Sequence, residues 1–242
     1  MPRQHVNTHI ALIACVCLCL LGYLSWFESR AQEAVAQVAA GPDYDSPDSM
    51  SVIVNKHRPL ADPAYVPQDL ADIGGVQLRS EAAAAYLQMN ADAAAAGVGL
   101  VAVSGFRTAD AQTHLHSSYS NTYGQQAAES ISARPGYSEH QTGLAVDIGN
   151  PDGACSLEPC FEATPAGAWA AANAHRYGFI IRYPAGAEAA TGFGYEPWHL
   201  RYVGSELAAA LTGSGQTLEQ YAGLPSAPSY PSAPSYPADR AR

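Results

Sequence analysis

Two polar motifs, Ser138–Asp147 and Glu196–His199, constrain the fold of this chain more than any other feature of its sequence. Together they supply two histidines and acidic side chains, and they lie far apart along the chain. These side chains can act on one another only if a completed fold brings both segments together. Two imidazoles and one carboxylate are the protein ligands of many catalytic zinc sites, which keep a fourth position open for water. A further carboxylate could take a proton from that water, so the chemistry indicated is metal-assisted hydrolysis.

The first motif is predicted to place two of these side chains close together. His140 and Asp147 are separated by a segment that contains Gly143, and Leu144–Ile148 has the character of a short buried strand. Glycine accepts the backbone conformations of a tight turn. A turn here can fold the histidine back beside the aspartate at the strand end.

The second motif contains a proline, which limits its conformation. Pro197 lies between Glu196 and His199, and proline is disfavoured in the interior of a regular helix. The motif therefore differs from the helical two-histidine motif of the common zinc proteases. We expect a loop that leads into a strand over Trp198–Val203 and places Glu196 across the open coordination site.

Composition excludes one class of partner. The chain has 242 residues, 48% of them hydrophobic, which is enough for one catalytic domain with appendages. Its formal net charge is -10, with only 12 Lys and Arg residues. Because phosphate binding needs clustered basic side chains, nucleic acid is not expected as a partner.

An uncharged apolar stretch, Ile10–Phe27, lies near the N-terminus. At the helical rise it spans roughly 27 Å, close to the hydrocarbon thickness of a bilayer. It predicts a signal-anchor helix that follows a cytoplasmic segment, residues 1–9, or else the core of a long signal peptide cleaved near Ala34–Ala36. Both interpretations send the remaining chain out of the cytoplasm, and the uncleaved anchor is favoured.

The cysteines fall into two groups. Cys15, Cys17 and Cys19 lie within the apolar stretch, where we expect them to be small apolar fillers. Cys155 and Cys160 are the remaining two, and in an oxidising compartment they predict a structural disulfide that closes a short loop. A metal pair is the less favoured alternative, because no second Cys or His pair lies nearby.

Local composition divides the rest of the chain into three parts. Residues 28–50 are rich in Ala, Gln, Asp and Pro and predict a tether, and residues 51–222 form the expected domain. Residues 223–242 predict a disordered tail rich in Pro, Ser and Tyr, in which Ser-Ala-Pro-Ser-Tyr-Pro occurs at 226–231 and again at 232–237. Proline at this density forbids a packed helix, so we expect an extended, solvated tail. Partner binding or threading through a cell wall is an alternative role.

Local signals within the domain predict alternating helices and short strands. We expect strands over 98–103, 144–148, 179–183 and 198–203, and helices over 80–96, from Thr108, over 164–178, 205–211 and 217–221. This irregular order predicts an α+β fold, with a small antiparallel sheet flanked by helices.

The two polar motifs together resemble the VanY-type zinc D-alanyl-D-alanine carboxypeptidases, within the wider LAS group of peptidases (lysostaphin, D-Ala-D-Ala metallopeptidases, Hedgehog). Supporting segments that resemble the family are Val54–Leu60, Ser104–Thr108, Asn173–Phe179 and Arg182–Pro184. The similarity extends from about Val54 to Val203. It implies a LAS/Hedgehog-like zinc peptidase fold and one bound Zn²⁺ ion.

Position by position, the resemblance implies roles for the residues of both motifs. His140, Asp147 and His199 match the zinc ligands of the family. Glu196 matches its general base. No departure from the family pattern occurs at these positions.

The resemblance also implies residues that contact the substrate. Arg107 matches the family arginine that faces the substrate, where a guanidinium could hold a terminal carboxylate or stabilise the developing oxyanion. Gln112 and Ser138 match positions that hydrogen-bond the carboxyl end of the substrate, although each could equally be a local cap or turn residue. Phe106 stands where relatives often carry tyrosine.

The resemblance, together with the apolar stretch Ile10–Phe27, implies an exported, membrane-tethered zinc peptidase of the bacterial cell envelope. Its expected substrate is a peptidoglycan stem peptide that ends in D-Ala-D-Ala, from which it removes the terminal D-alanine. Alternatives with the same fold are an L,D-carboxypeptidase, a D-Ala-D-Ala dipeptidase and a cross-bridge endopeptidase. A non-catalytic, zinc-stabilised wall-binding module is the alternative from another class.

Overall fold

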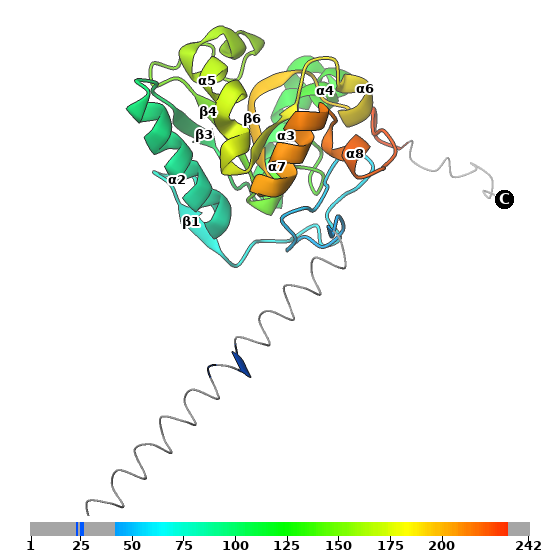
Figure 1. Ribbon diagram of the computed structural model, residues 1–242. Helices are drawn as coiled ribbons and strands as arrows, with labels where there is room; N and C mark the ends of the chain where they lie inside the picture. Colours follow the sequence, from blue (N-terminus) through cyan, green and yellow to red (C-terminus); the bar gives the residue numbers. More distant parts are fainter. Residues whose placement is uncertain (1–22, 24, 27–41, 232–242) are drawn as a thin grey trace, which may run out of the picture. The chain divides into compact units, whose positions relative to one another are not determined.

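The computed structural model describes residues 23, 25, 26 and 42–231 (Figure 1). The chain divides into two units, Met1–Asp43 and Tyr44–Arg242, and the second contains the described domain. Most of the predicted anchor over 10–27, including its three cysteines, lies outside the described residues, as do residues 1–9 and 28–41. Within the described part of the chain, no helix has both the length and the apolar character needed to cross a membrane.

The domain mixes strands with helices throughout its length. Its strands are β1 (Leu70–Asp72), β2 (Gln77–Arg79), β3 (Val101–Ser104), β4 (Ala145–Gly149), β5 (Phe179–Tyr183) and β6 (Glu196–Tyr202). Its α-helices are α2 (Ser80–Ala95), α3 (Ala109–Tyr123), α4 (Gln125–Ile131), α5 (Pro165–Asn173), α6 (Glu188–Thr191), α7 (Ser205–Ser214) and α8 (Leu218–Tyr221). Short 3₁₀ helices are η1 (Glu139–Thr142), η2 (Pro159–Ala163) and η3 (Ala174–Tyr177).

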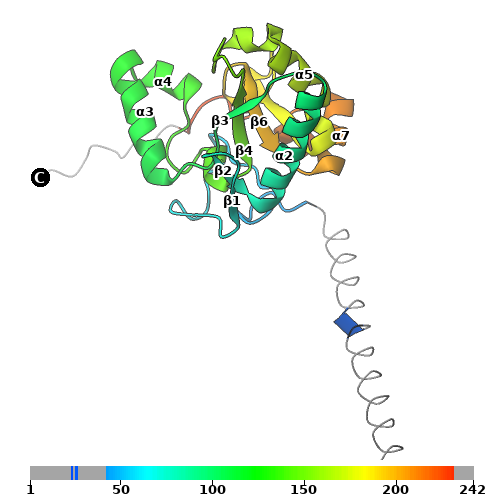
Figure 2. The ribbon, with the colours of Figure 1, turned by 90° about the vertical axis from the view of Figure 1, so that its left-hand side faces the viewer.

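The strands form two antiparallel sheets. β1 and β2 pair as a small ribbon, and the main sheet has the order β3-β4-β6-β5 with every neighbour antiparallel. Figure 2 shows α2 on one side of this sheet and α3 with α4 on the other. The predicted α+β class with a small antiparallel sheet is confirmed.

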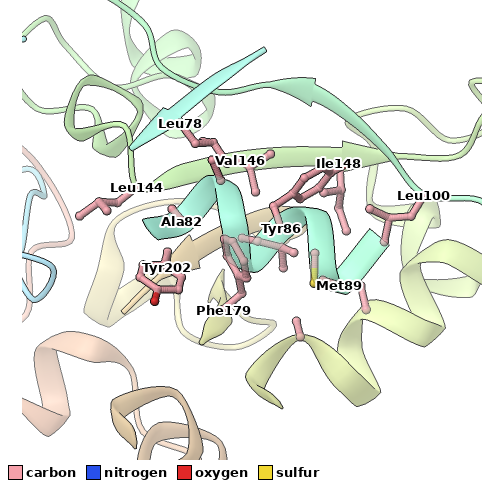
Figure 3. Packing of buried hydrophobic residues seen from close by; sticks show 14 of the residues in the cluster. Leu78, Ala82, Tyr86, Met89, Leu100, Leu144, Val146, Ile148, Phe179 and Tyr202 are labelled. Carbon is pink, nitrogen blue, oxygen red and sulfur yellow. The ribbon is translucent and has the colours of Figure 1, made fainter. Parts of the chain in front are cut away.

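The hydrophobic core lies between α2 and the main sheet (Figure 3). The alanine-rich helix buries Ala82, Tyr86 and Met89 against Val146 and Ile148 of β4. Full burial of a large apolar side chain contributes about 1.5–3 kcal/mol relative to an exposed one. Because side chains alternate along a strand, the residue between Val146 and Ile148 points to the opposite face.

The pairing of the two central strands, β4 and β6, determines which side chains lie on the face of the sheet opposite the core. β4 and β6 place Asp147 directly opposite His199 and Val146 directly opposite Leu200. Val146 and Leu200 face the core, so Asp147 and His199 share the other face. Two residues from motifs far apart in the sequence thus become cross-strand neighbours.

One strand begins earlier than its sequence predicts. β6 starts at Glu196 instead of Trp198, so Glu196 belongs to the strand and not to a preceding loop. The strand accommodates Pro197 because the pairing with β4 covers only residues further along, and the β5 register shifts between Ile181 and Tyr183. Proline is tolerated where a ladder is interrupted in this way.

The beginning of the proline-rich tail is packed, whereas its sequence predicts solvation. Ala227 is buried and its N–H donates to the Ala190 carbonyl at 2.8 Å. Tyr230 lies edge-on to Tyr137, and its hydroxyl accepts from the Arg134 N–H at 2.7 Å. Proline excludes a helix here but leaves an extended segment free to dock through its aromatic side chain. Residues 232–242, with the second hexapeptide, lie outside the described part.

Candidate active site

All seven residues that the sequence nominates for the site line one cleft of about 520 Å³. They come from the segment after β3, from α3, from η1 and the residue before it, and from β4 and β6. They are Arg107, Gln112, Ser138, His140, Asp147, Glu196 and His199. The fold therefore brings together side chains that the sequence alone could associate only by pattern.

Three of these residues converge closely enough to share one metal ion. His140, Asp147 and His199 are buried, and each offers a ligand atom within 4.8 Å of the other two. Asp147 Oδ2 lies 3.2 Å from His140 Nε2, and Asp147 Oδ1 lies 3.1 Å from His199 Nδ1. The two imidazole planes are nearly perpendicular, at 87°. Each oxygen of the Asp147 carboxylate thus faces the imidazole of a different histidine.

The turn before β4 positions His140. Gly143 ends η1 with a φ of 68°, and a Cβ added there would lie 3.0 Å from the Arg79 side chain and 3.2 Å from that of Leu70. The imidazole Nδ1 lies 2.7 Å from the Gly105 carbonyl. A carbonyl only accepts, so Nδ1 carries the proton and the Nε2 lone pair points toward Asp147.

The donor set fits a zinc site. Imidazole nitrogens and a carboxylate oxygen are ligands that Zn²⁺ accepts, and three protein ligands leave one position for water or substrate. Burial lowers the pKa of His140 and so favours its neutral form, which metal binding requires. Burial alone would raise the pKa of Asp147, but the neighbouring imidazoles hold it well below its usual value. Asp147 is therefore an anionic ligand at neutral pH.

Glu196 lies beside this triad, and the pKa of its carboxyl is raised above the usual value. Its carboxylate Oε2 is 3.7 Å from His199 Nδ1, and its largely buried side chain lines the cleft. Burial raises the pKa of the Glu196 carboxyl to about 7, and the nearby charge of Asp147 acts in the same direction. A carboxyl with such a pKa can exchange a proton near neutral pH.

Arg107 also lines the cleft, and two hydrogen bonds that its guanidinium donates fix its position. Its Nη1 donates to Gln112 Oε1 at 2.7 Å, and its Nη2 donates to Ser104 Oγ at 2.8 Å. Gln112 in turn donates both amide hydrogens, to the Ala133 carbonyl at 2.7 Å and to Ser132 Oγ at 3.1 Å. Gln112 therefore orients Arg107, and in this arrangement neither of its donors is free for a ligand.

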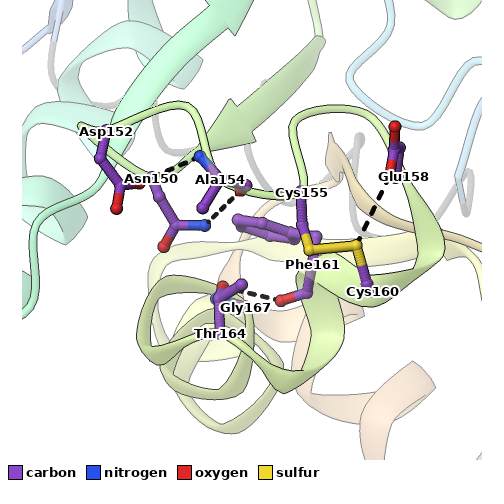
Figure 4. The surroundings of a disulfide bond; sticks show 9 residues. All are labelled: Asn150, Asp152, Ala154, Cys155, Glu158, Cys160, Phe161, Thr164 and Gly167. Carbon is purple, nitrogen blue, oxygen red and sulfur yellow. Dashed lines mark hydrogen bonds between the residues drawn. A yellow bond between two sulfur atoms is a disulfide. The ribbon is translucent and has the colours of Figure 1, made fainter.

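The remaining lining of the cleft includes Ser138 and several apolar side chains. Ser138 precedes η1, and its side chain makes no capping bond to that helix. Leu157 and Pro159 line the rim, in a loop that the Cys155–Cys160 disulfide closes (Figure 4). The bridge thus shapes one edge of the cleft.

A second group of charged residues, which sequence reasoning missed, lies behind the triad. Glu139, Arg182, Arg201 and Glu219 are fully or almost fully buried. The Oε1 atom of Glu139 accepts from Arg182 Nε and from Arg201 Nη1, each at 2.8 Å. The available signal was one arginine within each of two strand segments, Arg182 in Phe179–Tyr183 and Arg201 in Trp198–Val203, where most of the other residues are apolar.

Comparison with known proteins agrees with this geometry. Residues 75–205 match the VanY family, described as D-alanyl-D-alanine carboxypeptidase. A relative from Bacillus subtilis (strain 168) that bears the name of a carboxypeptidase, YodJ, is 37% identical over 204 residues, which cover 80% of this chain and 74% of the relative.

Two solved structures extend the similarity to three dimensions. The LdcB LD-carboxypeptidase is 39% identical with a TM-score of 0.68, over 73% of this chain and 87% of LdcB. A mutant of the vancomycin resistance D,D-pentapeptidase VanY, in complex with Zn(II), is 31% identical with a TM-score of 0.64, over 72% of this chain and 98% of that one.

Proposed function

The chain belongs to the VanY family of D-alanyl-D-alanine carboxypeptidases, and we propose that it removes the C-terminal D-alanine from peptidoglycan stem peptides as a zinc-dependent D,D-carboxypeptidase. The observation that carries this function is the convergence of His140, Asp147 and His199 beside Glu196 in one cleft. A buried triad with a carboxyl of raised pKa alongside suits hydrolysis better than structural metal binding, which closes all four positions.

The triad would hold the zinc ion through His140 Nε2, His199 Nδ1 and the Asp147 carboxylate. When bound, Zn²⁺ polarises a carbonyl and lowers the pKa of water at the site. The role of His140 and His199 is to present lone pairs, and the role of Asp147 is to supply negative charge between them. Their burial excludes bulk solvent from this side of the ion.

Glu196 would act as the general base. Its carboxylate accepts a proton from the attacking water and then donates that proton to the leaving amine of D-alanine. Its position next to His199 supports this role, because it places the carboxylate beside the position of the ion.

Arg107 would bind the free carboxylate of the terminal D-alanine. Guanidinium–carboxylate pairs form two parallel charge-assisted hydrogen bonds, which gives both strength and orientation. Gln112 and Ser104 hold the guanidinium from behind, and the Ser138 hydroxyl offers a further donor in the same cleft. Recognition of a chain terminus makes the enzyme an exopeptidase.

This substrate places the activity outside the cytoplasm, at the cell wall. We further propose that residues 10–27 anchor the chain in the cytoplasmic membrane, as their apolar sequence indicates. Alkaline carbonate extraction of cells that produce the full chain tests this anchor. Release of the chain into the soluble fraction would contradict it.

L,D-carboxypeptidase activity is the second candidate. It is favoured by the higher identity to the LdcB LD-carboxypeptidase, 39%, than to VanY, 31%. The two activities differ in the residue that precedes the cleaved bond, and the same triad and base serve both.

The deciding experiment offers the purified chain a stem pentapeptide that ends in D-Ala-D-Ala and the matching tetrapeptide. We expect mass spectrometry to find tetrapeptide and free D-alanine from the pentapeptide, with loss of both products on chelation and recovery with Zn²⁺. D-Alanine from the tetrapeptide alone would establish the L,D activity instead. No cleavage of either peptide by the zinc-loaded chain would overturn the hydrolase assignment, and Glu196→Gln serves as the inactive control.

A further inference from the structure

Two buried polar atoms face each other behind the metal triad. His199 Nε2 and Glu139 Oε2 are 3.7 Å apart, and neither has a hydrogen-bond partner at normal distance among the described residues. Buried polar atoms are nearly always paired. The 3.7 Å separation lies just beyond normal hydrogen-bond distance, so each atom is the other's nearest candidate partner.

The Glu139 carboxylate is held in place by groups on two strands. Its other oxygen accepts from Arg182 on β5 and from Arg201 on β6. Arg182 Nη1 donates to Glu219 Oε2 at 3.0 Å, and Arg201 Nη2 donates to the Val52 carbonyl at 2.7 Å. The position of Oε2 is therefore set by the sheet and not by a mobile side chain.

The proton on His199 decides whether its other nitrogen can bind a metal. A neutral imidazole has one N–H and one lone pair. Its Nδ1 faces Asp147 and must present the lone pair to an ion held by the triad. The proton must then lie on Nε2, where it needs an acceptor.

We propose that Glu139 is a positioning residue: its Oε2 accepts a hydrogen bond from the Nε2–H of His199 and so fixes the metal-binding tautomer. The inference rests on the proposed zinc site but not on the reaction carried out there. Because Glu139 immediately precedes His140, the single turn η1 serves both imidazoles: it carries one as a ligand and orients the other through its carboxylate.

The test compares two isosteric substitutions in the same buried network. In Glu139→Gln the amide oxygen can still accept from the arginines, but its NH₂ group then faces Nε2 and favours the wrong tautomer. Glu219→Gln removes the same charge and also contacts Arg182, yet it lies away from His199. We expect zinc affinity, measured by competition with a chromophoric chelator, to fall about 10- to 100-fold for Glu139→Gln. For Glu219→Gln we expect less than a twofold change.

A second measurement uses the unmodified chain. Long-range ¹H–¹⁵N spectra of the zinc-loaded protein, with His199 assigned by substitution, should show the proton on Nε2. A proton on Nδ1, unchanged zinc affinity in Glu139→Gln, or an equal loss in both variants would overturn the proposal. Neither measurement contains a peptide substrate, so failure of the proposed hydrolysis would not be mistaken for failure of this inference.

Discussion

Two buried clusters of charged side chains share strand β6 and differ in how their charges are balanced. The ligand cluster comprises His140, Asp147, Glu196 and His199, and the arginine cluster comprises Glu139, Arg182, Arg201 and Glu219. The arginine cluster sets two guanidinium groups against two carboxylates, with further bonds to backbone carbonyls. The ligand cluster brings carboxyls and imidazoles together with Arg107 only at its periphery.

This difference indicates that the arginine cluster stabilises the fold, whereas the ligand cluster carries out chemistry. Removing charges from water costs several kcal/mol per ion, and good pairing is needed to offset it. In the arginine cluster, the ion pairs between its own arginines and glutamates offset this cost of burial. In the ligand cluster, His140, Asp147 and His199 instead present ligand atoms close enough together to share one divalent cation. Substitution of an arginine in the first cluster should therefore reduce stability, whereas substitutions in the second should reduce activity.

The largest effect is expected from Glu196→Gln. Loss of the general base should lower kcat about 10²- to 10⁴-fold, while the stoichiometry of bound zinc and the free energy of unfolding stay unchanged. His140→Ala provides the contrast, because it should lose both zinc and hydrolysis. Full activity of Glu196→Gln on a D-Ala-D-Ala peptide would show that another group takes the proton.

The next effect concerns folding and comes from the arginine cluster. Arg201→Met leaves the buried carboxylate of Glu139 short of one partner, and breaking a buried pair costs about 3–5 kcal/mol. Denaturant unfolding of the metal-free chain should show this loss of free energy. Arg176→Met is the control, since its exposed bond to Asn173 should change the free energy of unfolding by no more than about 0.5 kcal/mol. Equal losses in both variants would remove the distinction between the clusters.

A smaller, selective effect is expected from Arg107→Lys. A lysine keeps the charge but cannot form the two-pronged grip, so KM for peptides with a free terminal carboxylate should rise about 10- to 100-fold. Inhibition by a peptide whose C-terminus is amidated should be unaffected by the substitution. If binding of the amide weakens equally, Arg107 shapes the cleft and does not read the carboxylate.

The smallest effect is a pH dependence of activity that the ligand cluster should confer through Glu196. Burial raises the pKa of Glu196 to about 7, and only its deprotonated form accepts a proton. The value of kcat/KM should therefore fall about tenfold per pH unit on the acid side of that pKa. A bound cation favours the deprotonated form of Glu196. The acid limb of the kcat/KM profile should therefore lie at or below about pH 7. An acid limb above this pH would assign it to a different group.

The local parts of the fold and site could be predicted from the sequence, whereas the contacts between distant segments could not. Thr108 and the Thr164-Pro165 pair begin helices as expected, because capping depends on neighbouring residues. The role of Glu139 depends on arginines from two later strands, which no local pattern joins to it. The docking of Tyr230 likewise depends on Arg134, far away in sequence.

The register that sets Asp147 against His199 also sets Val146 against Leu200. Side chains alternate with a period of two, so a slip by one residue would expose the apolar pair and bury the ligands on the wrong side. Evolutionary insertions and deletions within β4 or β6 would thus abolish folding and metal binding in a single event. The loops around the cleft, such as the segment closed by Cys155 and Cys160, lie outside this alignment and can change length without shifting it.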